Sequence, residues 1–414
     1  MNIELKNKIR DKTLQSLNYS ESVTDAELYD KIFEIINDFA KTSFMPLSVK
    51  EEMKNAVFYS IRGLDVLESL LSDENITEIM VNGPDNIFVE KKGKLFKTDL
   101  CFESEEKLLD IISHIASNVN RTVNESVPIA DARLTDGSRS NIVLPPVAIN
   151  GPALTIRKFS KKPLSMEDLC RMNALSTEAA EFIEKIVRAK YNIFVCGGTG
   201  SGKTTFLNAM AGFVPESERI ITIEDSAELK LQNIKNLVSL EARNGASREC
   251  AEITIRDLIR TALRMRPDRI IVGEVRGAEV IDMLSAMSTG HDGSFSTGHG
   301  NSIPDMLDRL ETMMLMGMDI PLSAVKKQIS SAIDIMIHLG RLRDGTRKVL
   351  EITEVLGVRD GEIELNPLFR FKENEKTCDL GSTEDFVTGE LVKTGNSLLC
   401  RGKLVRAGIT VNGA

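Results

Sequence analysis

The sequence predicts an α/β fold with a largely parallel sheet, preceded by a smaller α+β domain and a short helical segment. The first observation is the apolar run Ile193–Val195, which leads directly into a glycine-rich turn and then a helical pattern at 205–210. The second is a repeating alternation of short apolar runs with helical patterns, which is typical of strand–helix–strand units. These further runs are 220–223, 270–272, 293–297 and 333–339.

Changes of pattern along the chain divide it into successive segments. Apolar residues at helical spacing over 26–36 indicate that the first segment is helical, and short strands with one hairpin and one helix indicate an α+β domain next. Lys161-Lys162-Pro163 interrupts the pattern, as a linker does. The segments are 1–60 (helical), 61–160 (α+β), 161–172 (linker), 173–366 (the α/β domain) and 367–414 (a polar, irregular tail with a small hairpin over 398–409).

Composition narrows the class of protein. Lys plus Arg is 52 and Asp plus Glu is 61 in 414 residues, so the formal charge of −9 argues against a surface built mainly for nucleic acid. No apolar run is long enough to span a bilayer, and the first residues do not resemble a signal peptide, so we expect a cytoplasmic protein. The six cysteines are scattered and show no zinc-binding spacing.

The stretch 197–204 reads Gly-Gly-Thr-Gly-Ser-Gly-Lys-Thr and matches the P-loop pattern. A strand, a glycine-rich turn and a helix N-terminus form an anion site, because backbone N–H groups and the helix dipole favour phosphate. We predict that Lys203 reaches the outer phosphates of ATP and that the Thr204 hydroxyl binds Mg²⁺. The alternative is a turn that binds nothing. The predicted nucleotide-binding residues of this stretch are Gly198, Thr199, Gly200, Ser201, Gly202, Lys203, Thr204 and Thr205.

Carboxylates follow two of the predicted strands. Glu224 and Asp225 end the run 220–223, and Glu274 follows 270–272 after Gly273, which stands where many P-loop enzymes place aspartate. The carboxyl ends of parallel strands meet at one edge of a sheet. We therefore predict catalytic roles for Glu274, Lys203 and Glu224, with Glu274 polarising the water that attacks the γ-phosphate. The predicted Mg²⁺ ligands are Thr204, Glu224 and Glu274; the alternatives are a helix cap for Glu224 and a surface position for Glu274.

Histidines and arginines complete the predicted site. The tetrad Ser-Thr-Gly-His occurs twice and ends at His291 and His299, which we interpret as phosphate sensors or relays rather than metal ligands. Arg139 follows a tight turn and Arg157 lies on a predicted strand, and each is either a functional residue or a solvated surface arginine. Candidates for closing the site across a subunit boundary, against the alternative of helix-surface charge, are Arg260, Arg264 and Arg266.

Several of these motifs together resemble the type II/type IV secretion ATPases. Their Walker A, Asp box, Walker B and His box are similar to 197–205, 223–225, 263–277 and 289–294. The amino-terminal motifs are most similar to the Flp (Tad) pilus assembly ATPase branch: Ile-Thr-Glu-Ile-Met-Val-Asn-Gly-Pro (76–84), Asp-Ala-Arg-Leu-Thr-Asp-Gly-Ser-Arg (131–139) and Gly-Pro-Ala-Leu-Thr-Ile-Arg-Lys-Phe (151–159).

The resemblance implies a ring of six subunits, each with an amino-terminal domain and a RecA-like motor domain that bind ATP and Mg²⁺ at their junction. It implies that Arg139 and Arg157 reach the phosphates when the domains close, and that Gly273 is a family trait. It also implies work at the cytoplasmic face of the inner membrane, with a platform protein as partner, in pilus assembly or protein secretion. We expect the hinge at Lys161-Lys162-Pro163. The alternatives are a nucleotide-gated ring scaffold with negligible turnover and a nucleic-acid translocase, although no nucleic acid is expected.

Overall fold

The computed structural model describes residues 3–17, 23–41, 44–91, 93–119, 121–159, 163–243, 251–374 and 387–409. The chain forms two compact units, Met1–Lys161 and Lys162–Ala414. Of the predicted hinge, Lys161 and Lys162 lie outside the described residues. No helix in the described part of the chain is both long and apolar enough to cross a membrane.

The first unit begins with three helices, α1 (Ile3–Ser16), α2 (Asp25–Ala40) and α3 (Leu47–Arg62). Thr24 and Glu27 form a capping box that fixes the start of α2. Apolar residues from all three helices pack into one core, which includes Ile9, Ile32 and Val57. The helical segment predicted from the sequence is therefore a packed bundle.

A six-stranded sheet follows, with α4 (Leu67–Ser72) and α5 (Glu105–Ser117). The strand order is β3-β2-β1-β6-β5-β4 and all neighbours are antiparallel. Alternate residues of the strands pack with the two helices into a single core. The strands are β1 (Ile76–Asn82), β2 (Ile87–Lys91), β3 (Lys94–Lys97), β4 (Ile129–Arg133), β5 (Arg139–Val143) and β6 (Ala153–Arg157). The predicted α+β pattern and its hairpin, β2–β3, are confirmed.

The second unit contains a nine-stranded sheet of order β15-β14-β13-β12-β7-β11-β10-β8-β9. Within this order, the neighbours in the stretch β12-β7-β11-β10-β8-β9 pair in parallel. The neighbours in the stretch β15-β14-β13-β12 pair antiparallel. The parallel strands are β7 (Ile193–Gly197), β8 (Arg219–Glu224), β9 (Asn236–Glu241), β10 (Arg269–Val272), β11 (Phe295–Gly298) and β12 (Ile335–Arg341). The others are β13 (Arg347–Arg359), β14 (Glu362–Glu373) and β15 (Gly389–Lys393). The predicted parallel α/β sheet is confirmed.

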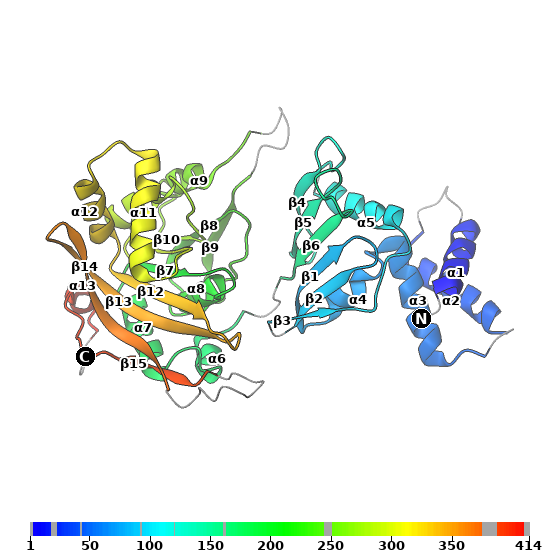
Figure 1. Cartoon of the computed structure of the whole chain (residues 1–414), viewed down its shortest axis with the longest axis horizontal. Helices are drawn as coiled ribbons and strands as arrows, with labels where there is room; N and C mark the ends of the chain where they lie inside the picture. Colours follow the sequence, from blue (N-terminus) through cyan, green and yellow to red (C-terminus); the bar gives the residue numbers. More distant parts are fainter. Residues whose placement is uncertain are drawn as a thin grey trace. The chain divides into compact units, whose positions relative to one another are not determined.

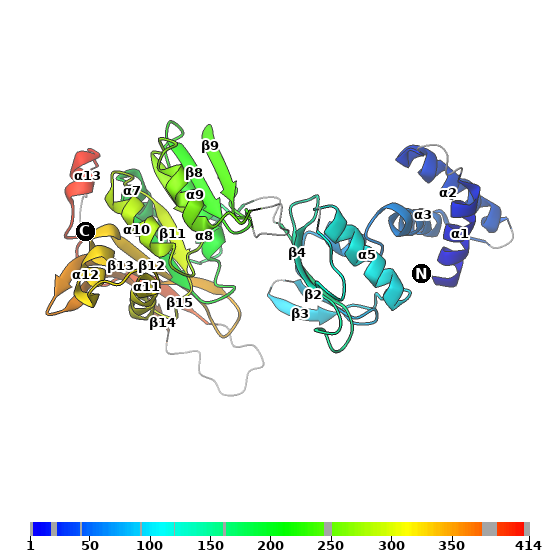
Figure 2. The same cartoon turned by 90° about the horizontal axis from the view of Figure 1, so that it is seen from above.

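Helices cover both faces of this sheet (Figure 1 and Figure 2). One core contains α6 (Met166–Arg171), α7 (Thr177–Arg188) and α8 (Lys203–Ala211). The other contains α9 (Ile255–Ala262), α10 (Val280–Ser288), α11 (Ile303–Gly317) and α12 (Leu322–Ala332). Along β7, Ile193 and Val195 join the first core and Phe194 and Cys196 the second, so both faces of the strand are buried.

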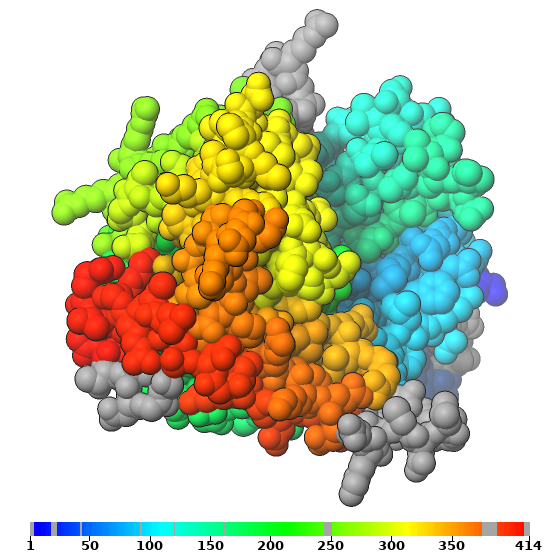
Figure 3. Space-filling view, turned by 60° about the vertical axis from the view of Figure 1, so that its left-hand side comes forward, coloured from blue at the N-terminus to red at the C-terminus, as the bar shows by residue number. Residues whose placement is uncertain are grey.

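The carboxyl-terminal segment differs from its prediction. We expected an irregular tail after 366, but β14 continues to Glu373, β15 pairs with it, and α13 (Gly402–Arg406) replaces the expected hairpin over 398–409. Leu391, Leu398 and Leu404 are buried in the core of the second unit. In Figure 3 this red segment lies beside the orange hairpin β13–β14. Widely spaced leucines in a polar segment give no periodic signal, so the pattern alone did not show this packing.

Candidate functional site

The glycine-rich turn joins β7 to α8. Gly200 and Gly202 have φ angles of +71° and +96°, a left-handed conformation that glycine adopts readily. Gly202 is the N-cap of α8, so the turn presents backbone N–H groups at the positive end of a helix. Ser201 Oγ is buried there and makes no hydrogen bond within the described residues. An unpaired hydroxyl at the N-terminus of a helix fits the binding of a phosphate.

Lys203 links this turn to the neighbouring strands. Its Nζ donates hydrogen bonds to the carbonyl oxygens of Gly197 and Gly198 at 3.0 Å each, and lies 3.3 Å from His299 Nδ1. Because an ammonium group can only donate, Nδ1 accepts and the proton of the neutral imidazole lies on Nε2. Nε2 is 2.9 Å from Glu274 Oε1. His299 therefore connects Lys203 to Glu274.

The environment of His299 favours its neutral form. Its pKa lies below the usual value, first because the ring is partly buried and then because Lys203 is close; Glu274 acts in the opposite direction. A neutral imidazole can accept from Lys203 and donate to Glu274 at the same time, which an imidazolium cannot do. These two contacts are compatible with a relay between Lys203 and Glu274, and the predicted role of His299 stays a prediction.

Glu224 is buried at the end of β8, 5% exposed. Its Oε1 accepts hydrogen bonds from the amides of Glu228 and Leu229 at 2.9 and 3.1 Å. Burial raises the pKa of Glu224 to about 7, and the two amides act in the opposite direction. The side chain thus holds the loop after β8, in addition to any part in the reaction.

The packing of Glu224 also explains Gly273. A Cβ atom on Gly273 would lie 2.8 Å from Glu224 Cγ, which is too close for any side chain. The Gly273 amide donates to Ile223 O at 2.8 Å, and its carbonyl accepts from Thr297 Oγ1 at 2.7 Å. An aspartate at this position would displace either Glu224 or the backbone. The buried glutamate of β8 therefore requires glycine at the end of β10.

Glu224→Gln is expected to reduce the pH dependence of stability. A raised pKa means that the folded state binds the proton more tightly than the unfolded chain, so the free energy of unfolding falls as pH rises from 4.5 towards about 7. The loss is at most about 3 kcal/mol. Glutamine has no charge, and its carbonyl can still accept from both amides. Urea unfolding between pH 5 and pH 8 should show wild type losing stability relative to the variant; parallel curves would contradict the raised pKa.

The predicted Mg²⁺ ligands have the right chemistry. Thr204 lies on the first turn of α8 beside Lys203, and both Thr204 and Thr205 are partly buried. Hydroxyl and carboxylate oxygens are the hard ligands that Mg²⁺ prefers, so Thr204, Glu224 and Glu274 fit the ion chemically. In the described residues, no group of three or more histidine, cysteine or acidic side chains forms a ready metal site.

Two arginines that the sequence analysis did not single out lie beside the turn. A Cβ on Gly200 would lie 3.9 Å from Arg341 Nη1, and one on Gly202 would lie 3.5 Å from Arg347 Cδ. The two arginines are register partners on β12 and β13, and β12 runs parallel to β7. They add positive charge where phosphate would bind. The signal was present, because Arg341 follows the predicted strand 333–339 at the edge that holds the turn.

His291 lies at the opposite edge of the sheet. It precedes β11 whereas His299 follows it, and β11 runs parallel to β7. The carbonyl of His291 accepts from Ser294 Oγ at 2.7 Å, in a loop that is also bonded to Asn192 at the start of β7. Within one chain the structure therefore does not place His291 at the phosphate-binding turn, contrary to its prediction as a nucleotide-binding residue. A full strand length separates the two histidines.

Arg139 and Arg157 lie on the sheet of the first unit. They are register partners on β5 and β6, and Arg133 is the partner of Arg139 on β4. Arg157 Nε lies 4.0 Å from Glu78 Oε1 on β1. The sequence analysis did not foresee this row of three guanidinium groups, because the pairing of β4, β5 and β6 is not visible in local patterns.

The helix arginines have separate surroundings. Arg260 Nε lies 2.9 Å from Asp282 Oδ1, so this arginine forms an ion pair between α9 and α10. Arg264 and Arg266 are exposed in the segment that follows α9. Their predicted action across a subunit boundary stays a prediction.

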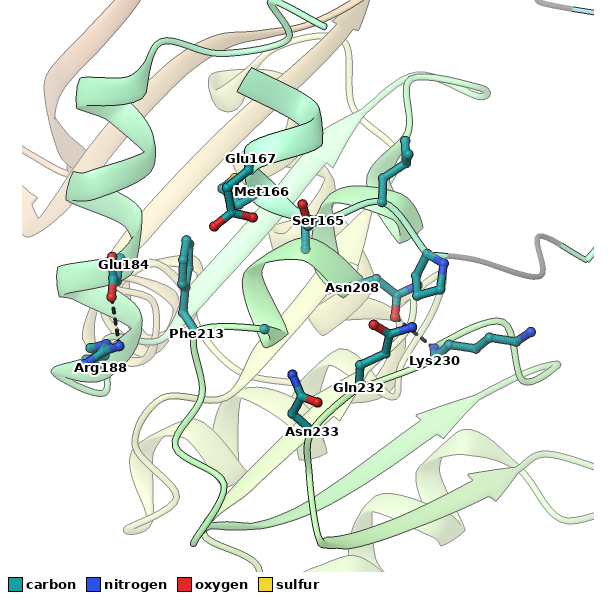
Figure 4. Close-up of a pocket in the computed structure, with 14 residues that line it drawn as sticks. Ser165, Met166, Glu167, Glu184, Arg188, Asn208, Phe213, Lys230, Gln232 and Asn233 are labelled. Carbon is teal, nitrogen blue, oxygen red and sulfur yellow. Dashed lines mark hydrogen bonds and ion pairs between the residues drawn. The ribbon is translucent and has the colours of Figure 1, made fainter. Parts of the chain in front are cut away.

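A separate cavity of about 400 Å³ lies at the carboxyl-terminal end of α8 (Figure 4). Its lining includes Pro163 and Asn208, and Asn208 Oδ1 accepts from the Lys230 amide at 2.8 Å. The ion pair between Arg188 Nη2 and Glu184 Oε1, at 2.9 Å, lies at one side. Because the phosphate-binding turn precedes α8, this cavity is not part of the cluster around Lys203.

The chain is similar to a known family and to several known proteins. The model of the family described as type II/IV secretion system protein matches residues 61–385. A Mycobacterium tuberculosis protein named for conjugal transfer is 37% identical over 310 residues, which cover 73% of this chain and 87% of that protein. The type IV secretion system protein VirB11 of Brucella suis is 31% identical over 320 residues, covering 70% of this chain and 88% of its own length.

The fold is also shared with solved structures. The ATPase DotB of Legionella pneumophila is similar with a TM-score of 0.50 and 23% identity, over 70% of this chain and 79% of that one. The two units thus correspond to an amino-terminal domain and a RecA-like α/β domain, the fold class that the sequence predicted. Because the family model matches most of the chain, the protein belongs to the type II/IV secretion system protein family.

Proposed function

We propose that the chain is a Mg²⁺-dependent ATPase that works as a ring of six subunits and powers pilus assembly, of the Flp (Tad) kind, or protein secretion. The observation that carries this proposal is the contact chain from Lys203 through His299 to Glu274, at the edge of the sheet that holds the phosphate-binding turn. Membership of the family supports a location at the cytoplasmic face of the inner membrane and a platform protein as partner.

In the proposed reaction each residue has a distinct task. The turn and Lys203 bind the phosphates, and Thr204 would hold Mg²⁺, which would neutralise phosphate charge. Glu274 accepts a hydrogen bond from the attacking water and so directs its lone pair at the γ-phosphate. When phosphate binds, it draws Lys203 away from His299, while His299 keeps its contact with Glu274. The loss of the Lys203 contact is how His299 reports that the site is filled.

We further propose that Arg139 and Arg157 contribute positive charge to the bound nucleotide. Their support is the resemblance of the amino-terminal motifs and the register pairing of β5 and β6, which holds two guanidinium groups on neighbouring strands. Guanidinium groups suit this task because they are permanently charged and bind phosphate oxygens in pairs.

Steady-state ATP hydrolysis and oligomer mass, measured side by side with and without Mg²⁺, test the proposal. Glu274→Gln should lower kcat at least about 100-fold, because the amide cannot accept the proton of water, while ring mass and ATP binding are retained. Arg139→Ala and Arg157→Ala should lower turnover in the same assay. Glu181→Gln is the matched control, since it makes the same change on the exposed surface of α7.

The outcome distinguishes a motor from a scaffold. Hydrolysis that rises with ring formation and disappears in Glu274→Gln supports the motor. Equal rates in wild type and Glu274→Gln, or a wild type that stays monomeric with ATP and Mg²⁺, would refute it and favour a nucleotide-gated scaffold. Hydrolysis stimulated by DNA would favour a nucleic-acid translocase instead.

A further inference from the structure

Arg276 is the second side chain that holds Glu274. Arg276 Nη2 donates to Glu274 Oε2 at 3.0 Å, while Glu274 Oε1 faces His299 at 2.9 Å. The two carboxylate oxygens therefore have different neighbours, and among the described residues only Oε2 accepts a hydrogen bond. Because Oε2 is bonded to Arg276 and Oε1 is in close contact with His299, rotation of the carboxylate about its last torsion is restricted.

Arg276 is itself tied to a second strand. Its Nη1 lies 3.5 Å from Asp225 Oδ2, directly after β8, whereas Glu274 follows β10. Since β8 and β10 are neighbours in the sheet, the guanidinium bridges the ends of two adjacent strands. One planar group with several donors can do this, and a single ammonium cannot do it as well.

The backbone that carries Arg276 and Glu274 is also fixed. The Val275 amide donates to Thr297 O on β11 at 2.9 Å. The amides of Arg276 and Gly277 both donate to Glu279 Oε1, at 2.6 and 2.8 Å. Little motion is left in the main chain, so the orientation of the Glu274 carboxylate depends on its side-chain partners.

We propose that Arg276 is a positioning residue for Glu274, which it holds in the water-polarising orientation by bridging it to Asp225. The proposal rests on the proposed function, in which Glu274 directs the attacking water. An ordinary surface ion pair contributes little, but the Glu274 side chain is only 20% exposed and its Oε2 accepts a hydrogen bond from Arg276. The value of the bridge therefore lies in orientation rather than in stability.

Arg276→Ala is expected to lower kcat by about 10- to 100-fold, because a misplaced catalytic group loses rate without losing substrate. The KM for ATP and the affinity for ADP should change by less than about threefold. Arg276→Lys should recover part of kcat, since it restores a charge but not the fork. Arg359→Ala is the control, because Arg359 also pairs with an acidic side chain, Glu364, but lies at the opposite edge of the sheet.

A double-mutant cycle separates the bridge from other roles. Asp225→Asn should lower kcat by less than Arg276→Ala, and the double variant should be no slower than Arg276→Ala alone, because the bridge is already broken. Losses that multiply would overturn the proposal. So would an unchanged kcat in Arg276→Ala, or a loss confined to ATP affinity, which would mean that Arg276 binds the nucleotide directly.

Melting temperatures of all variants accompany these assays. If Arg276→Ala has a lowered melting temperature, the same test uses Arg276→Lys, Asp225→Asn and the double variant that combines these two. Losses in kcat that do not multiply support the bridge, and losses that multiply overturn it. The two proposals fail separately: hydrolysis that persists in Glu274→Gln refutes the proposed function, whereas a silent Arg276→Ala beside an inactive Glu274→Gln refutes only the positioning role.

Discussion

Gly197→Ala is expected to destabilise the protein by about 3 kcal/mol and to weaken nucleotide binding. A Cβ on Gly197 would overlap the carbonyl oxygen of Leu339, its register partner on β12, and would lie 2.7 Å from Ser201 Oγ. Backbone in the middle of a sheet cannot move aside, so the strand end and the turn must shift. Each charge-assisted hydrogen bond to phosphate that is lost weakens binding by roughly 10- to 100-fold.

Gly198→Ala is the matched control for stability. A Cβ on Gly198 would meet no heavy atom within 4 Å, so the same substitution one residue later has space. Thermal unfolding without nucleotide should therefore separate the two variants, with Gly198→Ala close to wild type. Titration with a fluorescent ATP analogue then measures the binding loss in Gly197→Ala. If both variants melt at the same temperature, the close contact with Leu339 does not limit this position.

Arg269→Met is expected to lower the free energy of unfolding by about 3–5 kcal/mol. Arg269 is completely buried, and its Nε and Nη2 donate to the two carboxylate oxygens of Glu218 at 2.5 and 3.1 Å. Its Nη1 donates to Val187 O at 2.8 Å and to Gly293 O at 3.3 Å. Methionine fills much of the space but leaves Glu218 as a poorly solvated charge, with only Lys190 nearby at 3.7 Å among its described partners.

The double variant Arg269→Met/Glu218→Met should regain much of that loss. Removing both charges removes the desolvation cost that one of them alone incurs. Arg188→Met is the control, because it breaks the exposed pair with Glu184 and should cost less than about 1 kcal/mol. Urea unfolding measures all of these variants. This account would be contradicted if the free energy of unfolding of Arg269→Met lay within about 1 kcal/mol of wild type, which is the scale of a surface pair. It would also be contradicted if the double variant were no more stable than Arg269→Met alone.

Much of the fold and of the site followed from local patterns in the sequence. Buried parallel strands are short apolar runs, so β7, β8, β10 and β12 were visible along the chain, and left-handed glycines with Lys203 defined the turn. Because parallel strands end at one edge, residues after those runs were expected together, and Glu274, His299 and Lys203 are indeed in contact.

The tertiary structure alone decided how neighbouring strands are ordered and which side chains meet. It placed His291 and His299 at opposite edges, brought Arg341 beside the turn, and set Arg276 between Glu274 and Asp225. It also packed the carboxyl-terminal leucines on the sheet. These contacts join residues that are distant in the chain, and hydrophobic periodicity reports only whether a segment is buried. Strand order and side-chain reach, which determine the catalytic partners, exist only once the sheet has formed.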